Sequence, residues 1–557
     1  MIDPFSRFLD HYYRRRPVNA TFTGMHVYDA TLPDWSPSGL VSLEGELRTL
    51  LAQVNDLYPA PSSAREYRDD VDLLDAELIR AFCETQLSEN ASMHGMRGNP
   101  ALWTGEAVFS IVALMIRDFG PLDDRIRAAT ERLKAIREFL DHARVALGER
   151  PIPAPWTARA LRDCEGAALL FTAGVAQWMA SGRHSPANEP PALAAATNAA
   201  VAFHDFADWL RTRGDAGQQA MACGAEHFDL LLARGHQSGR TRGALLDDAR
   251  FQLDEACRAL DTVAHDAGGP WSVVQEHLAA DHPKADEYFA TFEHQWRVCH
   301  RTALDANAVS WPDWPISFGE IPVWTREAAP YLDYPYYRSP APLDPYDEYE
   351  YTIPPLPLGD ATAYLRTWSH STIKLCHVMH HAGIGHHLQN WHAYHRSNSR
   401  VGKIAAVRCA NRIGVVCGET LAEGWACYAT DVMEELGALL PRERAAAQHA
   451  RVVRLVRAVV DLSLHDGSLS VEDAVALFVA RAQMERAAAR TEVSRCSMFP
   501  GSALSSWLGV QGIHDLRDAL RERWGDGFSL KRFHDELLRF GSIPVPLIAR
   551  LMLAEVA

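Results

Sequence analysis

The chain has 557 residues, of which 47 % are hydrophobic and 23 % are charged, close to the average of soluble globular proteins. It carries 55 Lys and Arg against 71 Asp and Glu, which gives a net charge of −16. This composition argues against a disordered or collagen-like chain. The acidic balance argues against binding to nucleic-acid phosphates or to an anionic membrane surface.

No feature of the sequence suggests export or membrane insertion. The start, Met1-Ile2-Asp3-Pro4, lacks a basic segment followed by an apolar one. The longest weakly charged stretch lies near residues 167–180 and is shorter than the ~20 residues that a membrane span needs. The ten cysteines are scattered and none forms a C-x-x-C pair. We therefore expect a cytoplasmic protein.

Apolar residues recur at helical spacing along most of the chain, which predicts a mainly α-helical protein. The pattern is broad over residues 71–84. Further helices are predicted over residues 121–147, 156–179, 191–210, 244–264, 442–465, 471–490 and 504–523.

Two segments interrupt this helical pattern, residues 16–40 and residues 329–360. The second holds eight of the 31 prolines and seven of the 16 tyrosines, so we expect loops and short strands there. Alternation over 348–353 predicts an edge strand. We interpret 329–360 as a connector between an N-terminal helical half, 1–328, and a C-terminal half, 361–557. A substrate-facing wall is the alternative.

Seven of the 25 histidines fall within residues 377–395. They are His377, His380, His381, His386, His387, His392 and His395. Imidazole is the commonest protein ligand for metals such as zinc, so this density predicts a metal site.

The spacing of these histidines does not fit a regular helix around one ion. His380 and His386 are six residues apart, about 240° around a helix, so they can share an ion only if the helix is distorted. Gly383 and Gly385 lie between them, and glycine tolerates irregular backbone. His387 lies on the same face as His380 but roughly 10 Å along the axis.

A second motif contains two carboxylates at helical i, i+4 spacing, Glu419 and Glu423. The surrounding residues are apolar, so a buried carboxylate there would need a partner. Glu423 is therefore a candidate metal ligand, and an exposed helix face is the alternative. For Glu419 the two interpretations are equally supported.

Several motifs, in order along nearly the whole chain, resemble the bacterial domain-of-unknown-function family 885. The family's H-E-x-x-P-G-H-H-L-Q aligns with residues 380–389, and its E-G-W-A-x-Y with residues 423–428. Later matches are Asp461 to His465, Glu492 to Cys496 with Pro500-Gly501, and Phe533-His534 to Pro544. An early match runs from Ala20 to Asp29.

This resemblance implies a helical zincin-like fold with a deep central channel, similar to thimet-oligopeptidase-like and Taq-carboxypeptidase-like metallopeptidases. It implies His380, His386 and Glu423 as metal ligands, with His387 as a second candidate. His465 and Arg495 would line the pocket and bind a substrate carboxylate or an oxyanion.

The chain departs from the family pattern at the position of the general base. The family has Glu after the first motif histidine, and this chain has His381. In a zincin that Glu takes a proton from the attacking water, and its loss costs roughly 10²–10⁴-fold in rate. Ile384, Ser463 and Cys496 replace the family's Pro, Gly and Tyr.

Three interpretations stay open. The protein is a metal-dependent hydrolase of a short peptide or small molecule, with His381 or Glu419 as the base. Alternatively, the extra imidazole alters the chemistry, and the enzyme acts on a small metabolite or a natural-product intermediate. The third interpretation is a non-catalytic relic that binds a peptide or ligand. Zinc is the expected metal, with Fe, Mn, Ni or Cu as alternatives.

Overall fold

The structure is a computed structural model that describes residues 4–60, 63, 66–67, 70–332, 334–344, 349–409, 412–413 and 418–554. It is mainly α-helical with small β segments, which confirms the predicted fold class. No helix of the described residues is long and apolar enough to cross a bilayer.

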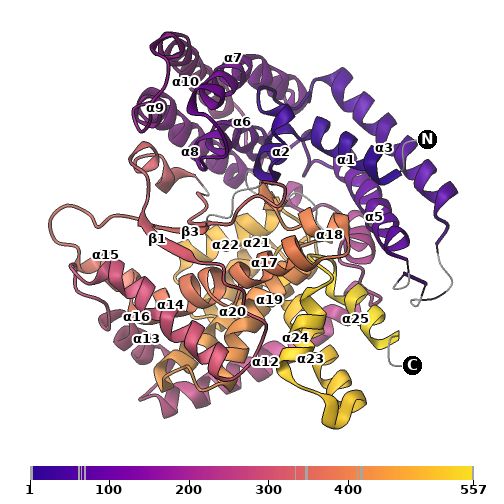
Figure 1. Ribbon diagram of the computed structural model, residues 1–557, viewed down its shortest axis with the longest axis vertical. Coiled ribbons are helices and arrows are strands. Elements are labelled where there is room, and N and C mark those ends of the chain that lie inside the picture. The colour runs from indigo at the N-terminus through magenta and orange to yellow at the C-terminus, as the bar shows by residue number, and fades with distance from the viewer. Residues whose placement is uncertain are drawn as a thin grey trace.

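The N-terminal helices form one side of the molecule, at the top and right of Figure 1. They are α1 Pro4–Arg15, α2 Pro17–Thr23, α3 Pro37–Leu57, α5 Val71–Ala91, α6 Pro100–Met115, α7 Leu122–Leu147, α8 Ala154–Leu169, α9 Val175–Met179 and α10 Glu189–Arg211. Helices α11 Ala225–Leu230, α12 Arg242–Asp266, α13 Trp271–Ala280 and α14 Tyr288–Asp305 follow.

The C-terminal part carries the histidine-rich segment near the middle of Figure 1. Its elements are α15 Thr362–Thr367, α16 His370–Thr372, the π-helix η8 Ile373–Ala382, α17 His386–Arg396, α18 Arg400–Ile404, α19 Glu419–Glu435, α20 Pro441–Leu464, α21 Val471–Arg481, α22 Arg486–Met498, α23 Ser505–Trp524, α24 Leu530–Leu538 and α25 Val545–Ala554. Strands β4 Arg408–Cys409 and β5 Arg412–Ile413 pair in antiparallel orientation.

Three strands interrupt the helical architecture between α14 and α15. They are β1 Ile316–Glu320, β2 Tyr337–Arg338 and β3 Tyr349–Ile353, in the order β1-β3-β2. The strand predicted over 348–353 therefore exists, but its described part, β3, lies in the centre of the sheet instead of at its edge. Both edges of β3 are paired, parallel with β1 and antiparallel with β2. Residue 348 lies outside the described residues.

Most predicted helices are confirmed, and three predictions differ. The segment 471–490 divides into α21 and α22, and Gln483 between them has a φ of 49°, a left-handed conformation that ends a helix. The segment 156–179 is interrupted by a π-helical turn, Leu170–Gly174. The segment 16–40, predicted to be irregular, contains the short helix α2.

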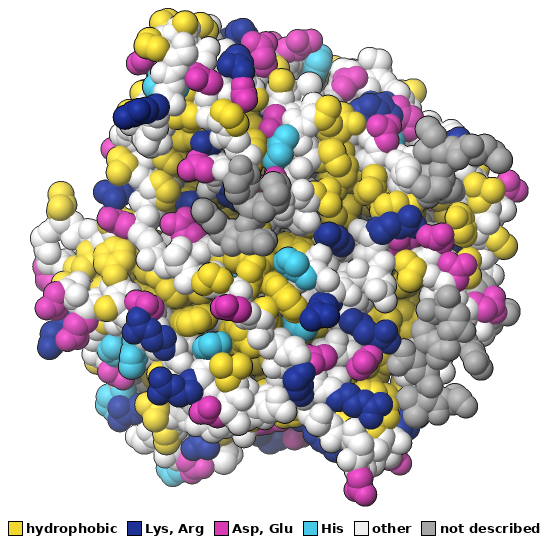
Figure 2. All heavy atoms as spheres, viewed as in Figure 1, with side chains coloured by type: hydrophobic (Ala, Val, Ile, Leu, Met, Phe, Trp, Pro, Cys, Tyr) yellow, Lys and Arg dark blue, Asp and Glu magenta, His cyan; other side chains and the backbone are white. Residues whose placement is uncertain are grey.

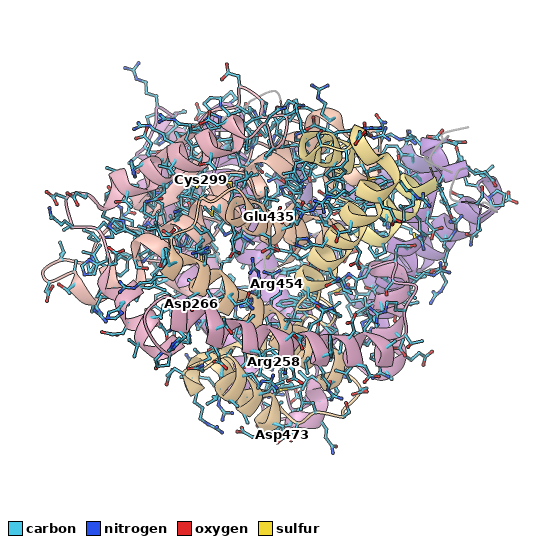
Figure 3. The ribbon with its side chains drawn as sticks, turned by 90° about the horizontal axis from the view of Figure 1, so that it is seen from below. Arg258, Asp266, Cys299, Glu435, Arg454 and Asp473 are labelled. Carbon is cyan, nitrogen blue, oxygen red and sulfur yellow. The ribbon has the colours of Figure 1, made fainter. Side chains whose placement is uncertain are left out.

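Two hydrophobic clusters form the core. The larger one runs from Phe5 to Met552 and joins residues of the N-terminal, connector and C-terminal segments. The smaller one joins 221–278 to 445–508 and includes the packing of α12 against α20. Figure 3 shows α12, with Arg258 and Asp266, in the lower part of the view, and Asp473 of α21 beyond it. On the face in Figure 2, acidic and basic side chains are intermixed instead of forming a field of one sign.

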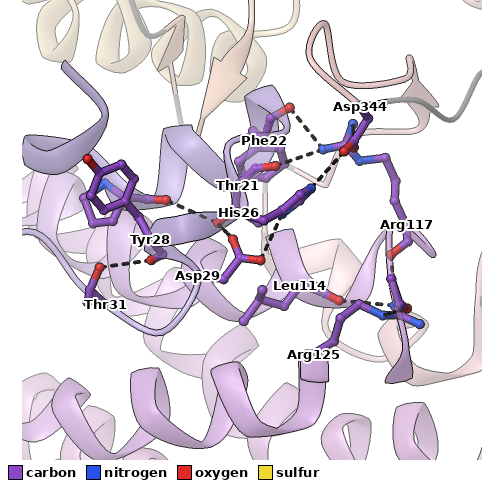
Figure 4. Close-up of polar contacts among 12 residues, drawn as sticks. Thr21, Phe22, His26, Tyr28, Asp29, Thr31, Leu114, Arg117, Arg125 and Asp344 are labelled. Carbon is purple, nitrogen blue, oxygen red and sulfur yellow. Dashed lines mark hydrogen bonds and ion pairs between the residues drawn. The ribbon is translucent and has the colours of Figure 1, made fainter. Parts of the chain in front are cut away.

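A polar network fastens the early motif to the connector (Figure 4). The His26 ring bonds Asp29 through Nδ1 and Asp344 through Nε2, each at 2.9 Å. Its ring stacks on Phe119 with centroids 3.8 Å apart. Burial lowers the pKa of His26, but the hydrogen bonds and charges of the two carboxylates outweigh it and raise the pKa to about 9. The charged imidazole thus joins two segments far apart in sequence.

Candidate metal centre

The histidine-rich segment consists of two helices separated by a tight bend. The π-helix η8 ends at Ala382, and α17 begins at His386. At the bend the Gly383 amide donates to the Val378 carbonyl at 2.7 Å, and the Gly385 amide to the Met379 carbonyl at 2.9 Å. This is the distortion that the six-residue spacing requires. The π-helical winding itself was not predicted.

Glycine at 385 is required by the close approach of the backbone. A Cβ atom on Gly385 would lie 2.0 Å from the His380 carbonyl oxygen, well inside van der Waals contact. A Cβ on Gly383 would meet the Val378 carbonyl oxygen at 3.0 Å. The bend therefore depends chiefly on Gly385 to return the chain toward His380.

Two tryptophans hold the bend in place. The Trp425 indole N–H donates to the Ile384 carbonyl at 2.8 Å, and that of Trp296 to the Ala382 carbonyl at 2.9 Å. Both carbonyls have left the regular helical pattern, so these bonds satisfy groups that would otherwise be buried and unpaired. Trp425 comes from α19, the helix that carries Glu423, so one residue couples the two halves of the site.

A close contact between two helices positions Glu423. Gly424 of α19 faces Gly509 of α23, and a Cβ on Gly424 would lie 2.5 Å from the Gly509 Cα. A Cβ on Gly509 would lie 2.0 Å from the Thr420 carbonyl oxygen. The two glycines let α19 press against α23, which leaves the neighbouring Glu423 side chain directed at η8.

The result is a group of four side chains from two segments. The Glu423 carboxylate lies 3.9 Å from His380 Nε2 and 3.8 Å from His386 Nε2. Donor atoms of His380, His381 and His386 all lie within 4.8 Å of one another. Side-chain exposure is 22 % for His380, 10 % for His386 and 17 % for Glu423, so the group is largely buried but partly accessible to solvent.

His387 and His377 are not part of this group. His387 Nε2 lies 3.1 Å from the Trp314 carbonyl, and its Nδ1 lies 3.3 Å from the Tyr337 hydroxyl. His377 Nδ1 lies 2.5 Å from the Tyr351 hydroxyl. Burial lowers the pKa of both rings to about 4, so both are neutral. Of the two adjacent candidates, His386 is the one that the structure brings to His380.

Glu419 lies at the N-terminus of α19, one turn before Glu423. Its Oε1 accepts a hydrogen bond from the Ser502 hydroxyl at 2.5 Å. The loop that carries Ser502 is in turn held by Asp461, which accepts from the amides of Gly501 at 3.2 Å and Leu504 at 3.0 Å. Glu419 is thus a carboxylate whose orientation is fixed, on the same helix as Glu423.

The structure does not bring His465 to the group. Its side chain is fully buried, with Nε2 3.2 Å from both the Cys496 carbonyl and Asp461 Oδ1. Its ring also packs against His94 and Phe228. The predicted pairing of Asp461 with His465 is therefore present, but as part of the interior. Arg495 is exposed on α22.

Sequence reasoning missed two arginines of α20, Arg454 and Arg457, which lie close to Cys427, one turn after Glu423. Burial raises the pKa of the Cys427 thiol, and the positive charges of Arg454 and Arg457 oppose this. Arg457 forms two hydrogen bonds with Glu492, at 2.7 and 2.9 Å. Arg454 lies near the middle of Figure 3. The signal was available, because both arginines interrupt an otherwise apolar stretch of α20.

The donor set fits a divalent metal of the first transition row. Imidazole nitrogens suit zinc, iron, nickel and copper, whereas magnesium and calcium prefer oxygen ligands throughout. Two imidazoles and one carboxylate match the ligand type of catalytic zinc sites. The distances of 3.8 and 3.9 Å from the carboxylate to the two imidazoles need only a small contraction around an ion.

Comparisons with known proteins agree with the motif pattern. The family model described as "Bacterial protein of unknown function (DUF885)" matches residues 17–552. No curated protein matches the chain.

Two solved structures have a similar fold over nearly the full length. One, from Shewanella oneidensis, is described as a "putative lipoprotein of unknown function"; it has 21 % identity, a TM-score of 0.75, and coverage of 98 % of each chain. The other, described as a "putative lipoprotein" from Colwellia psychrerythraea, has 17 % identity, a TM-score of 0.70, and coverage of 99 % of this chain and 98 % of that one. Because its model spans almost the whole sequence, the chain belongs to the DUF885 family of bacterial proteins of unknown function.

Proposed function

We propose that the protein is a metal-dependent hydrolase related to zincin-like metallopeptidases. In this proposal His380, His386 and Glu423 hold one divalent ion, and zinc is the expected metal. The observation that carries this proposal is the convergence of these three side chains from two segments, at 3.8 and 3.9 Å. A bend, two indole hydrogen bonds and a glycine–glycine contact support the convergence, so the arrangement is built into the fold.

When bound there, a divalent ion supplies Lewis-acid activation of water and of the scissile carbonyl. The base that the family motif provides is replaced by His381. Two groups beside the site can accept the proton instead, the Glu419 carboxylate and the His381 imidazole. Glu419 is the better positioned of the two, because the Ser502 hydroxyl fixes its orientation.

The substrate that fits this setting is a short peptide or small molecule with an acidic end. Arg454 on α20 places positive charge near Cys427, one turn after Glu423 on α19, whereas the chain as a whole carries a charge of −16. Arginine binds carboxylates through two parallel hydrogen bonds.

The proposed location is the cytoplasm. The cysteines whose side chains the structure describes are all free, as is usual in a reducing compartment.

The test is a hydrolysis assay on mixed short peptides with untagged protein, either loaded with zinc or stripped by a chelator. We expect zinc-dependent cleavage that Glu423→Gln abolishes and that His395→Gln, an exposed substitution on α17, leaves unchanged. His381→Glu restores the family motif and is expected to raise the rate by roughly 10²-fold or more. If the zinc-loaded wild type and His381→Glu both fail to cleave, the peptidase proposal is wrong.

The second candidate is a metal-dependent enzyme of changed chemistry on a small metabolite or natural-product intermediate. The favouring observation is that His381 belongs to the same group as His380 and His386, within 4.8 Å. A protein that binds metal but cleaves no peptide would favour this candidate. A protein that binds no metal would favour a ligand-binding relic.

A further inference from the structure

We infer that His381 is a fourth metal ligand, so that the site consists of three imidazoles and one carboxylate. The inference rests on the proposed function for the presence of the ion, and it deepens that function. It assigns the residue at the position of the family's general base to metal binding instead of proton transfer.

The distances place His381 beside the two other histidines of the group. Its donor atom lies within 4.8 Å of those of His380 and His386. Donors bound to one ion at about 2.1 Å are roughly 3.0 to 3.4 Å apart when adjacent and about 4.2 Å apart when opposite. All three nitrogens can therefore reach one ion through side-chain rotations that shorten the separations by roughly 1 Å or a little more.

The ring orientations also fit a common centre. The His380 and His381 ring centroids are 4.7 Å apart with planes at 84°, and those of His380 and His386 are 4.9 Å apart at 90°. The His381 and His386 centroids are 5.3 Å apart. The three rings thus lie at similar distances from one another, and none is separated from the other two by an intervening side chain at these spacings.

The local backbone explains how neighbouring residues can share an ion. On a regular α-helix, consecutive side chains diverge by about 100°. Here both residues lie in the last turn of the π-helix η8, and the bend at Gly385 returns the chain so that the His386 ring lies near both of their rings, with centroids 4.9 and 5.3 Å away. The π-helical turn and the bend thus bring three imidazoles together although two of them belong to consecutive residues.

The consequence is a nitrogen-rich site that selects its metal. Three imidazoles favour late first-row ions such as zinc, nickel or copper, and also iron, over magnesium and calcium. A four-coordinate ion would be saturated by the protein, as in structural zinc sites, whereas a six-coordinate ion keeps two positions. The exposed side of the group, at His380 and Glu423, is where a small ligand would reach those positions.

X-ray absorption spectroscopy of the zinc-loaded and nickel-loaded protein tests this inference directly, because scattering from imidazole rings reports how many are bound. We expect three imidazoles in the wild type and in His395→Gln, and two in His381→Gln. Metal titration should show that His381→Gln weakens binding by at least roughly tenfold, since even residues behind the ligands contribute that much.

The possible outcomes separate the inference from the proposed function. If the wild type binds one ion through two imidazoles and His381→Gln binds it equally well, the inference is wrong and the proposed function stands. If the wild type binds no ion, both fail. Thermal unfolding of apo His381→Gln alongside the apo wild type checks that the variant is folded. If it is unfolded, His381→Asn provides the same comparison with a shorter amide.

Discussion

At the scale of single residues, the site depends on backbone geometry as much as on its donor atoms. The sequence placed two glycines between His380 and His386, and the need for a distorted helix could be predicted from the spacing alone. The π-helical turn and the indole bonds from Trp296 and Trp425 could not, because they depend on contacts between segments 41 to 86 residues apart.

Substituting Gly385 tests the importance of the bend. We expect Gly385→Ala to abolish stoichiometric metal binding and to destabilise the protein, because its Cβ would lie 2.0 Å from the His380 carbonyl oxygen. The matched control is Gly45→Ala on α3, where a Cβ meets nothing within 4 Å. There we expect stabilisation by about 0.5–1 kcal/mol. Metal titration measures the effect on binding, and denaturant unfolding measures the effect on stability. A Gly385→Ala variant that binds metal with wild-type affinity would show that the bend is not required.

His26 predicts a specific pH dependence of stability. Its pKa is raised to about 9 in the folded protein, above the ordinary value of 6.5. Its stabilising contribution is therefore complete below about pH 6.5 and is lost as the pH rises towards 9, on the order of 3 kcal/mol in total. His26→Gln should unfold more easily at pH 6 than the wild type, and the difference should shrink by pH 9. Denaturant unfolding at both pH values measures this, and a difference independent of pH would exclude the mechanism.

At the scale of the elements, the helical periodicity predicted most of the helices but not their pairings. The candidate ligands lie on η8, α17 and α19, and these elements are held by contacts that no local pattern encodes, such as Gly424 against Gly509. The predicted edge strand became a central strand because its neighbours β1 and β2 lie 11 or more residues away in sequence. His465 shows the same limit: a motif histidine is fully buried in the interior.

A buried ion pair between Lys374 and Glu443 joins η8 to α20. Lys374 Nζ lies 2.6 Å from Glu443 and donates to the Ala438 carbonyl at 2.7 Å, and both side chains are less than 10 % exposed. We expect Lys374→Met to cost about 3 kcal/mol in the free energy of unfolding, because it leaves Glu443 buried without its cation.

A surface pair provides the comparison for this prediction. Lys134 and Glu131 on α7 are also paired, at 2.7 Å, but both side chains are more than half exposed. Lys134→Met should cost less than about 1 kcal/mol. Denaturant unfolding of the two variants measures the contrast, and equal costs would show that burial of the Lys374 pair has no special effect.

At the scale of the whole molecule, the larger hydrophobic cluster joins residues from Phe5 to Met552, so segments far apart in the sequence share the core that contains the elements of the site. The two proposed halves and the connector all contribute to that cluster. This agrees with a family match and with similar folds that extend over nearly the full length. The proposed metal chemistry, by contrast, depends only on the side chains of His380, His381, His386 and Glu423.

The metal content of the purified protein shows whether this group of side chains binds an ion. Untagged protein, purified with zinc and then dialysed, is analysed by plasma mass spectrometry beside the double variant His380→Ala/His386→Ala. We expect about one equivalent of zinc per wild-type chain and almost none in the variant. Equal metal content in the two proteins, or none in the wild type, would contradict it.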